Sequence, residues 1–519
     1  MKKLLTGLIA GASVLFVSSI GFSAPPDDTF VVGLPTDTKG LEPAQISSRH
    51  TANIMKHMFG TLFFISEKGT LDPNLAESYS VSDDGKEYTF KLKEGLTCHD
   101  GEALTAEDAA YTFNRVVDPE LAFVGNSAGF VFPSIDFQSA RADSDLEVTI
   151  VMGAPNHVAL GLISEVYVHC KDSYEKMSKE EAAENPIGSG AYEFVKWDKG
   201  SQIVMKKAKN SAVPANFENL IWRVIPEAST RTAELIAGNV DMITNASPDQ
   251  VDAIDSSSTA KVQKVSGTRR MYVGFHQGEE YAVTEGGKAI QKSEVRRAIQ
   301  YAVDVEAICA NLLNAPCERA TGLVNPNNAH PTLKPYPYEP ATAEYLLDIA
   351  GYPRDADGVR FEITLEAGQG RYLNDKNVVL AICQYLDDIG IKTTCDIMDW
   401  SSVYVPKIRK KEAGPMFFLG SGGGTWNPLY DMSDLATVES GPNYTKWDNP
   451  EWFNGWKVIN NSSDPMVVRR EIDRMLEVFY NEGPWLLLYF QPDFYGVSNR
   501  VKWQERRDEE VDIFDASLN

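Results

Sequence analysis

LDPNLAESYSVSDDGKEYTFKLKEGLTCHDGEALTAEDAAYTFNRVVD, Leu71 to Asp118, holds one predictable strand and one predictable helix. Within it, Lys86–Leu96 alternates apolar and polar residues behind a DDG turn, which predicts a half-buried strand. Leu104–Val117 has the apolar spacing of a helix, and Thr105 followed by Asp108 comes close to a capping box. A strand followed by a helix is the pattern that the rest of the chain repeats.

Strands and helices alternate along the whole chain, which is typical of an α/β protein. The clearest unit comprises strand Phe361–Ala367, a helix over Asn374–Ile389 and strand Lys392–Trp400, a predicted βαβ unit. Glu294–Leu313 has the spacing of one long amphipathic helix. The densest apolar run after the N-terminus, PWLLLYF at Pro484–Phe490, has the length of a buried strand.

A glycine-rich turn, NPIGSGAYEFVKW, occupies Asn185–Trp197. A phosphate-binding loop would open a helix, whereas here the glycines lead into the alternating strand Tyr192–Trp197. Gly188-Ser189-Gly190 also lacks the spacing of a nucleophile elbow. The stretch therefore predicts a structural turn before a strand, which can pair with Ser201–Ala208 as a hairpin.

The first 23 residues have the pattern of a secretory signal peptide. Lys2 and Lys3 precede the apolar run Leu4–Ile20, and we expect cleavage between Ser23 and Ala24. An uncleaved anchor is the alternative, but the run is slightly short for a span of about 20 apolar residues. The mature chain is therefore expected to be an exported protein.

Length and charge exclude several classes of protein. The 519 residues exceed one ordinary hydrophobic core, so at least two lobes are expected. The formal charge of −24 argues against binding to nucleic acids and to anionic membrane surfaces, which attract basic proteins.

Six cysteines in an oxidising compartment suggest disulfides. Close spacing favours Cys309–Cys317 and Cys383–Cys395, which leaves Cys98 with Cys170. Since six cysteines permit fifteen pairings, this set is a preference among alternatives.

The sequence offers little for a metal site. The seven histidines are scattered, and no CxxC or clustered Cys/His spacing occurs. His99 and Asp100 are adjacent, which fits a turn with Gly101 better than a chelating pair. His169 ends a predicted strand and is a candidate to line a cleft, although a structural histidine is the simpler interpretation. No metal and no cofactor are predicted.

Three loops carry aromatic and polar side chains suited to a small molecule. Leu419–Met432, LGSGGGTWNPLYDM, exposes glycine backbone beside an aromatic ring that can stack on a ligand, or pack on its own loop. Two further loops, Asp399–Tyr404 and Gly441–Trp447, lie nearby in the sequence. The candidate ligand-binding residues in the three loops are Trp400, Tyr404, Thr425, Trp426, Asn443 and Tyr444.

In the order in which they occur, these segments resemble the extracellular solute-binding proteins of ABC importers, of the oligopeptide, dipeptide and nickel type. Leu71–Asp118 matches that family's most specific segment almost throughout, and NPIGSGAYEFVKW is similar to its NPxGTGPYxF turn and strand. RTAELIAGNVDM, VRRAIQYAVD and the YLLDIAGYP helix end also fit in order. The similarity runs from about Phe30 to Val501.

The resemblance implies the large, class-C form of the two-lobed periplasmic binding protein fold. Lobe I would comprise residues 24–268, with an extra subdomain at about 67–184, and a return segment at 484–519. Lobe II would comprise residues 269–483. The chain would cross between the lobes near Thr268–Phe275 and Gly483–Phe490, which would form the hinge.

The ligand is where this sequence departs from the pattern of the family. Peptide-binding members hold the peptide amino group with an Asp in a Trp-x-x-Asp loop, where this chain has Gly and Thr. Dipeptide-type members place an Arg for the carboxylate about where Trp400 stands. Without this Asp and this Arg, a bound dipeptide zwitterion would have buried charges that no protein group pairs with. Arg371 is a candidate to supply a charge to the pocket.

The resemblance therefore implies a monomeric receptor, without catalytic residues, that captures a peptide or similar small polar solute by closing its lobes. Its partner would be a membrane permease. An oligosaccharide or an opine-like solute is the alternative ligand, and a nickel or haem receptor would need His or Met at the pocket. A secreted α/β hydrolase is the alternative of a different class, and it would need a triad or a pair of acids that the sequence does not show.

Overall fold

The computed structural model describes residues 24–519 except 47, 67–68, 316, 423–425, 439 and 463. The predicted signal peptide and Thr425 lie outside the described residues. None of the described helices is long and apolar enough to cross a membrane.

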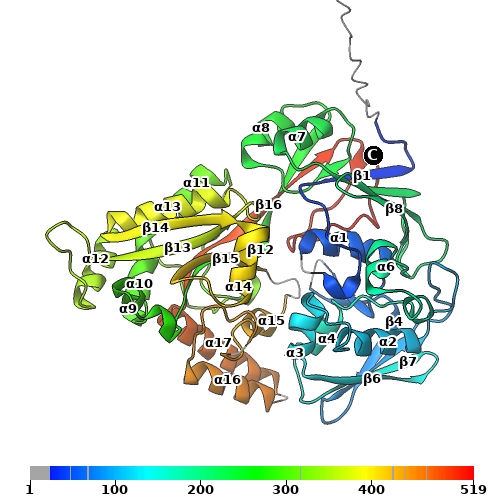
Figure 1. The fold of residues 1–519 in the computed structure, drawn as a ribbon, viewed down its shortest axis with the longest axis horizontal. Coiled ribbons are helices and arrows are strands. Elements are labelled where there is room, and N and C mark those ends of the chain that lie inside the picture. Colours follow the sequence, from blue (N-terminus) through cyan, green and yellow to red (C-terminus); the bar gives the residue numbers. More distant parts are fainter. Residues whose placement is uncertain are drawn as a thin grey trace, which may run out of the picture.

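A single mixed sheet runs through both lobes and forms the backbone of the fold (Figure 1). Its order across the described residues is β14 (Ile391–Asp399), β13 (Phe361–Gln369), β15 (Met416–Gly422), β12 (Ala260–Phe275), β16 (Trp485–Ser498), β11 (Met242–Ile243), β1 (Thr29–Leu34), β10 (Asn219–Val224), β9 (Gln202–Lys207) and β8 (Tyr192–Asp198). The first three strands belong to lobe II, and the last five belong to lobe I.

The long central strands β12 and β16 connect the two lobes. They pair antiparallel, but the register shifts between Ser266 and Arg270, and again between Arg270 and Tyr272. Gly267 lies in this interruption, where an added Cβ would stand only 2.3 Å from the backbone oxygen of Gln491. The pairing is therefore irregular between Ser266 and Tyr272, a stretch that overlaps Thr268–Phe275, where we expect the chain to cross between the lobes.

Lobe I adds a second, smaller sheet and short helices, at the right and top of Figure 1. That sheet has the order β4 (Ala76–Val81), β5 (Glu87–Leu92), β7 (Glu147–Met152) and β6 (Phe137–Ser144). Two short pairs complete the strands, β2 (Phe63–Ile65) with β3 (Leu71–Pro73), and β17 (Val501–Lys502) with β18 (Ser517–Leu518). The helices are α1 (Arg49–Met58), α2 (Ala106–Val116), α3 (Phe132–Ser134), α4 (Ala159–Ile163), α5 (Lys171–Tyr174), α6 (Lys179–Glu184), α7 (Ala228–Ile236) and α8 (Val251–Asp255).

Lobe II, on the left of Figure 1, surrounds its part of the sheet with longer helices. They are α9 (Glu285–Ala289), α10 (Ser293–Ala302), α11 (Val305–Leu312), α12 (Pro340–Ile349), α13 (Asp375–Asp388), α14 (Val405–Arg409), α15 (Pro428–Ser433), α16 (Pro450–Asn460) and α17 (Pro465–Glu482). The predicted βαβ unit is confirmed as β13, α13 and β14, with the two strands parallel and adjacent.

Local sequence signals set several element ends. The capping box that begins α2 is confirmed, because the Thr105 hydroxyl caps the helix and Asp108 Oδ2 accepts the Thr105 amide at 2.7 Å. The predicted single helix over Glu294–Leu313 is wrong. It is divided into α10 and α11, because Val303 is extended and the Asp304 side chain starts a new helix by accepting the Ala307 amide at 2.9 Å.

The predicted turn before β8 is confirmed, and the packing explains its glycines. A Cβ on Gly188 would lie 2.0 Å from the carbonyl oxygen of Met58, and one on Gly190 would lie 2.6 Å from that of His57. Only glycine allows this approach to the end of α1. The predicted hairpin of β8 with β9 is also present, at the edge of the large sheet.

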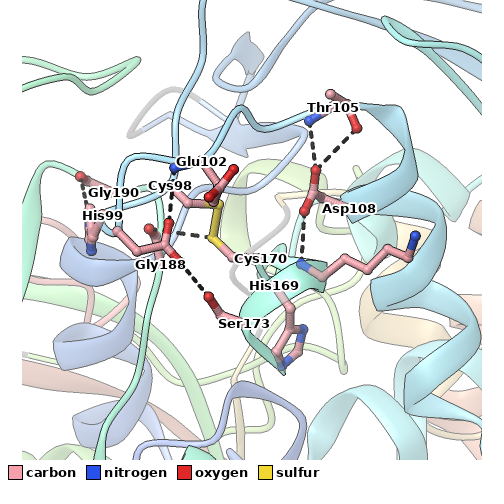
Figure 2. Close-up of a disulfide and its surroundings, with 12 residues drawn as sticks. Cys98, His99, Glu102, Thr105, Asp108, His169, Cys170, Ser173, Gly188 and Gly190 are labelled. Atoms are coloured by element: carbon pink, nitrogen blue, oxygen red, sulfur yellow. Dashed lines mark hydrogen bonds between the residues drawn. A yellow bond between two sulfur atoms is a disulfide. The ribbon is translucent and has the colours of Figure 1, made fainter. Parts of the chain in front are cut away.

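All three preferred cysteine pairs form disulfides. Cys98–Cys170 closes the longest loop, with a sequence separation of 72 residues. Figure 2 shows how it joins the turn after β5 to the start of α5, with the carbonyl oxygen of Gly188 alongside. This bond joins two parts of the extra subdomain, beside Gly188 in the segment that leads into β8.

Candidate functional site

A cavity of about 1930 Å³ lies between the lobes. Lobe I contributes residues around α1 and from the loops of its subdomain, and lobe II contributes the ends of β13, β14 and β15 with the loops that follow them. Its volume exceeds the roughly 300–1,000 Å³ of a pocket for a drug-sized molecule. The aromatic lining residues are Phe59, Phe64, Phe130, Tyr167, Tyr272, Tyr372, Trp400, Tyr430, Tyr444 and Phe514.

Three of the predicted ligand-binding residues line this cavity, namely Trp400, Tyr444 and Arg371. Trp400 begins a π-helical turn directly after β14, and its ring meets the ring of Tyr372 edge to face, with centroids 5.2 Å apart. The Arg371 guanidinium lies 5.3 Å from the centre of the same Tyr372 ring. These side chains form an aromatic wall on lobe II.

Trp426 packs between the lobes and is not among the cavity-lining residues. Its side chain covers Gly69 so closely that an added Cβ would stand 2.6 Å from the Trp426 Cβ. The Arg507 guanidinium lies 5.6 Å from its ring centre, and the ring nitrogen is buried. The structure therefore favours the alternative in which the Trp426 ring packs against protein rather than against a ligand.

Tyr404, Asn443 and His169 also lie outside the cavity lining, and each is fully buried. The Tyr404 hydroxyl donates to the carbonyl oxygen of Phe418 at 2.7 Å, and the Asn443 amide donates to the carbonyl oxygens of Thr437 and Trp447 at 3.0 Å. The Tyr404 and Asn443 side chains satisfy backbone groups, and the His169 ring bonds to Glu42, so we leave all three out of the proposed binding set.

Charged residues that the sequence did not single out stand behind the cavity near the hinge. Glu509 accepts two bonds from Arg269, at 2.5 and 2.8 Å, and lies 3.3 Å from Arg371. Burial raises the pKa of Glu509, but the guanidinium groups outweigh it and hold this pKa far below its usual value. Arg371 is therefore already paired, and its charge is shared with the protein.

The neighbouring acids of the same C-terminal segment bind the start of lobe I. Glu510 pairs with Arg49 at 3.0 Å and with Lys56 at 2.5 Å. In the sequence, the only indication of this network is the dense run of charged residues RRDEEVD at Arg506–Asp512. Such a run is equally compatible with a solvated surface, so the sequence alone does not predict the network.

The lobes contact each other through side chains at the cavity wall. The Tyr430 hydroxyl of lobe II donates to Glu165 of lobe I at 2.9 Å, and the Tyr430 ring meets the Phe130 ring with centroids 5.7 Å apart. His157 of lobe I also bonds to the carbonyl oxygen of Ile459 at 3.1 Å. A solute in the cavity is thus surrounded by both lobes.

His169 belongs to a buried ion network at the edge of the cavity. Its Nε2 lies 2.8 Å from Glu42 Oε1, and Arg115 reaches both Glu42 oxygens at 3.1 and 3.2 Å. Burial raises the pKa of Glu42, but His169 and Arg115 outweigh this and lower it to about 2. The network fixes the loop that starts the lobe I wall.

Because of the low pKa of Glu42, we expect the folded chain to lose stability in acid. Ionised Glu42 stabilises the folded chain at pH values above its unfolded pKa of about 4.5. This contribution, about 3 kcal/mol to the free energy of unfolding, disappears as the pH falls towards 2. Urea unfolding at pH 6, 4 and 2.5 should show a smaller acid loss in Glu42→Gln than in the unchanged protein. Glu306→Gln is the control, and equal losses in Glu42→Gln and the unchanged protein would contradict the prediction.

Within the described residues, no group of three or more His, Cys, Asp or Glu side chains is placed to hold a metal ion.

The two-lobed fold with its central cavity, and the order of the sequence segments, agree with a known protein family. The sequence profile of the bacterial extracellular solute-binding proteins, family 5, matches residues 70–442. The chain belongs to this family.

Relatives and solved structures extend the similarity over nearly the whole chain. The glutathione-binding protein GsiB of Escherichia coli K12 is 25% identical over 500 residues, which cover 93% of this chain and 92% of GsiB. The periplasmic binding protein DppA of Helicobacter pylori, solved with the peptide STSA, aligns with a TM-score of 0.81 at 20% identity, covering 94% and 98% of the two chains.

The oligopeptide-binding protein AppA of Bacillus subtilis, solved with a nonapeptide, aligns with a TM-score of 0.79 at 20% identity, covering 95% of this chain and 99% of AppA. These structures confirm the two-lobed fold, and the family confirms solute binding as its class of function. The names of these relatives describe binding proteins, and that of DppA describes a periplasmic binding protein associated with an ABC transporter.

Proposed function

We propose that this chain is the periplasmic receptor of an ABC importer, that it captures a peptide-type solute between its lobes, and that it hands the solute to a membrane permease as a monomer without catalysis. The observation that carries the proposal is the 1930 Å³ cavity, which both lobes line and which aromatic rings wall. A volume above that of most small-molecule pockets suits a peptide of several residues.

Binding in this arrangement works by a shift of population. A solute that contacts both lobes stabilises the closed form relative to the open form, and the interrupted pairing of β12 with β16 is where the chain can bend. Trp400 and Tyr444 enclose the solute, and Tyr372 and Arg371 support that wall. Trp426, predicted from the loop Leu419–Met432, is left out of this set because it does not line the cavity.

Small-angle X-ray scattering of the mature chain tests the proposal. A pool of di- to pentapeptides should reduce the radius of gyration, and mass spectrometry should recover the bound peptides uncleaved. Superimposable curves with peptide, oligosaccharide and opine pools would oppose closure on any of these solutes. If only the oligosaccharide or the opine pool reduces the radius of gyration, the ligand is one of those solutes and not a peptide. Recovery of cleaved peptides would indicate a hydrolase.

Trp400→Ala should weaken the binding of the best peptide by about 1–3 kcal/mol, because the ring supplies an aromatic contact face. Isothermal titration calorimetry measures the change. Tyr345→Ala is the matched control, because Tyr345 is an aromatic residue on the exposed face of α12, 64% exposed and outside the cavity. Equal dissociation constants for Trp400→Ala and the unchanged protein would remove Trp400 from the site.

A further inference from the structure

The Trp426 side chain of lobe II contacts lobe I at two places, both outside the cavity lining. It covers Gly69, in the turn between β2 and β3. On the return segment of lobe I, the Arg507 guanidinium lies over the ring, 5.6 Å from its centre. A guanidinium at this distance is attracted to the face of a tryptophan ring. The two lobes are therefore joined by a contact that needs no solute.

Arg507 is in turn bonded to the hinge strand β12 on both sides of Gly267. Its Nε donates to the carbonyl oxygen of Ser266 at 2.7 Å, and its own carbonyl oxygen accepts the Thr268 amide at 2.8 Å. The pairing of β12 with β16 is irregular at this place. A ring that holds Arg507 therefore acts on the stretch of chain where the lobes can bend.

The backbone that presents the Trp426 ring is strained. Its φ is 56°, in the left-handed region, which a residue with a bulky side chain rarely adopts. Such a conformation costs free energy and persists only where the surroundings impose it. The Asn328 amide donates to the Trp426 carbonyl oxygen at 2.8 Å, and the next residue, Asn427, caps α15. The loop of lobe II thus holds the ring in its place against lobe I.

The same segment contacts lobe I again four residues later. Tyr430, in α15, donates its hydroxyl to Glu165 at 2.9 Å, and its ring meets the Phe130 ring edge to face. Glu165 is itself held by the Asn126 amide, also at 2.9 Å. One short segment of lobe II, from Trp426 to Tyr430, therefore carries two separate contacts with lobe I.

We propose that Trp426 is a latch, which stabilises the closed form of the chain before any solute arrives by packing on Arg507 and Gly69. It is then a positioning residue for solute capture, because it acts through the hinge and touches no solute. The latch rests on the proposed function only in its consequence for binding. A larger closed fraction raises the apparent affinity for every solute by the same factor.

Small-angle X-ray scattering of the solute-free mature chain tests the latch without a ligand. Trp426→Ala and Arg507→Ala should each increase the radius of gyration, and the double variant should increase it no further, because each change breaks the same contact. Arg507→Lys should keep the smaller radius, since the cation remains. Lys502→Ala is the matched control, because it removes one positive charge from an exposed site of the same return segment, outside the cavity.

Two results would overturn the latch. Equal radii for the unchanged chain and Trp426→Ala would show that the ring does not favour closure. An increase in Arg507→Ala alone would assign the effect to the bond between Arg507 and Ser266. If Trp426→Ala loses its circular dichroism signal, the comparison of Arg507→Ala with Arg507→Lys decides, and equal radii of that pair would also overturn the latch.

Isothermal titration with peptides that the unchanged chain retains gives a second readout. Trp426→Ala should weaken the binding of two unrelated peptides by one common factor, about threefold to tenfold. Factors that differ between the peptides would place the ring on the solute and contradict the latch. Absence of any peptide binding would overturn the proposed function, whereas the scattering of the solute-free chain still decides the latch.

Discussion

Replacing Arg270 with methionine is expected to lower the free energy of unfolding by about 3–5 kcal/mol, because Asp431 then stays buried without its cation. Asp431 is fully buried, and its other oxygen accepts the Asn325 amide at 3.0 Å, so it cannot turn to solvent without breaking that bond. Arg270 itself lies in β12, where the register shifts beside the hinge. Urea unfolding followed by tryptophan fluorescence measures the loss.

A second substitution separates lost charge pairing from lost packing. Arg270→Met combined with Asp431→Asn removes both charges and keeps an oxygen for the Asn325 amide, so it should recover at least about 2 kcal/mol. Arg469→Met is the surface control, because Arg469 is 44% exposed and pairs with Asp473 one helical turn away. Its change should stay within about 1 kcal/mol. A double variant no more stable than Arg270→Met would show that the charge of Asp431 is not the cause.

Removal of the Cys98–Cys170 disulfide, by serine at both positions, is expected to destabilise the chain by about 4 kcal/mol. The bond restricts a 72-residue separation in the unfolded chain, and in the chain-entropy account longer loops give larger effects. It also ties the loop after β5 to the start of α5, beside the turn that enters β8 (Figure 2). Thermal and urea unfolding of oxidised protein report the change.

The matched control is the Cys309→Ser/Cys317→Ser variant, whose bond spans only 8 residues. The same account gives about 2.5 kcal/mol for that loop. The longer loop should therefore cost more when its bond is lost. An equal or reversed order would show that native packing, rather than loop length, sets the contribution of these bonds.

Most of the candidate site could not be predicted from residue order. Trp400 and Tyr444 were predictable as aromatic residues in loops that follow strands, and both line the cavity. Tyr404 stands four residues after Trp400 and was equally plausible, yet the π-helical turn points its hydroxyl at the carbonyl oxygen of Phe418. The difference between the two rings is a matter of backbone conformation, which the loop sequence does not specify.

By itself, the sequence determined the family, the α/β class, the βαβ unit, the α2 capping box and the preferred cysteine pairs. Those features depend on neighbours a few residues apart, or on spacing along the chain. Only the tertiary structure decided that Trp426 packs on Gly69, and that Glu165 and Asp434 face one cavity from different lobes. The physical reason is that the cavity wall is made where distant segments meet, so its charge balance and burial depend on the packing of the whole chain.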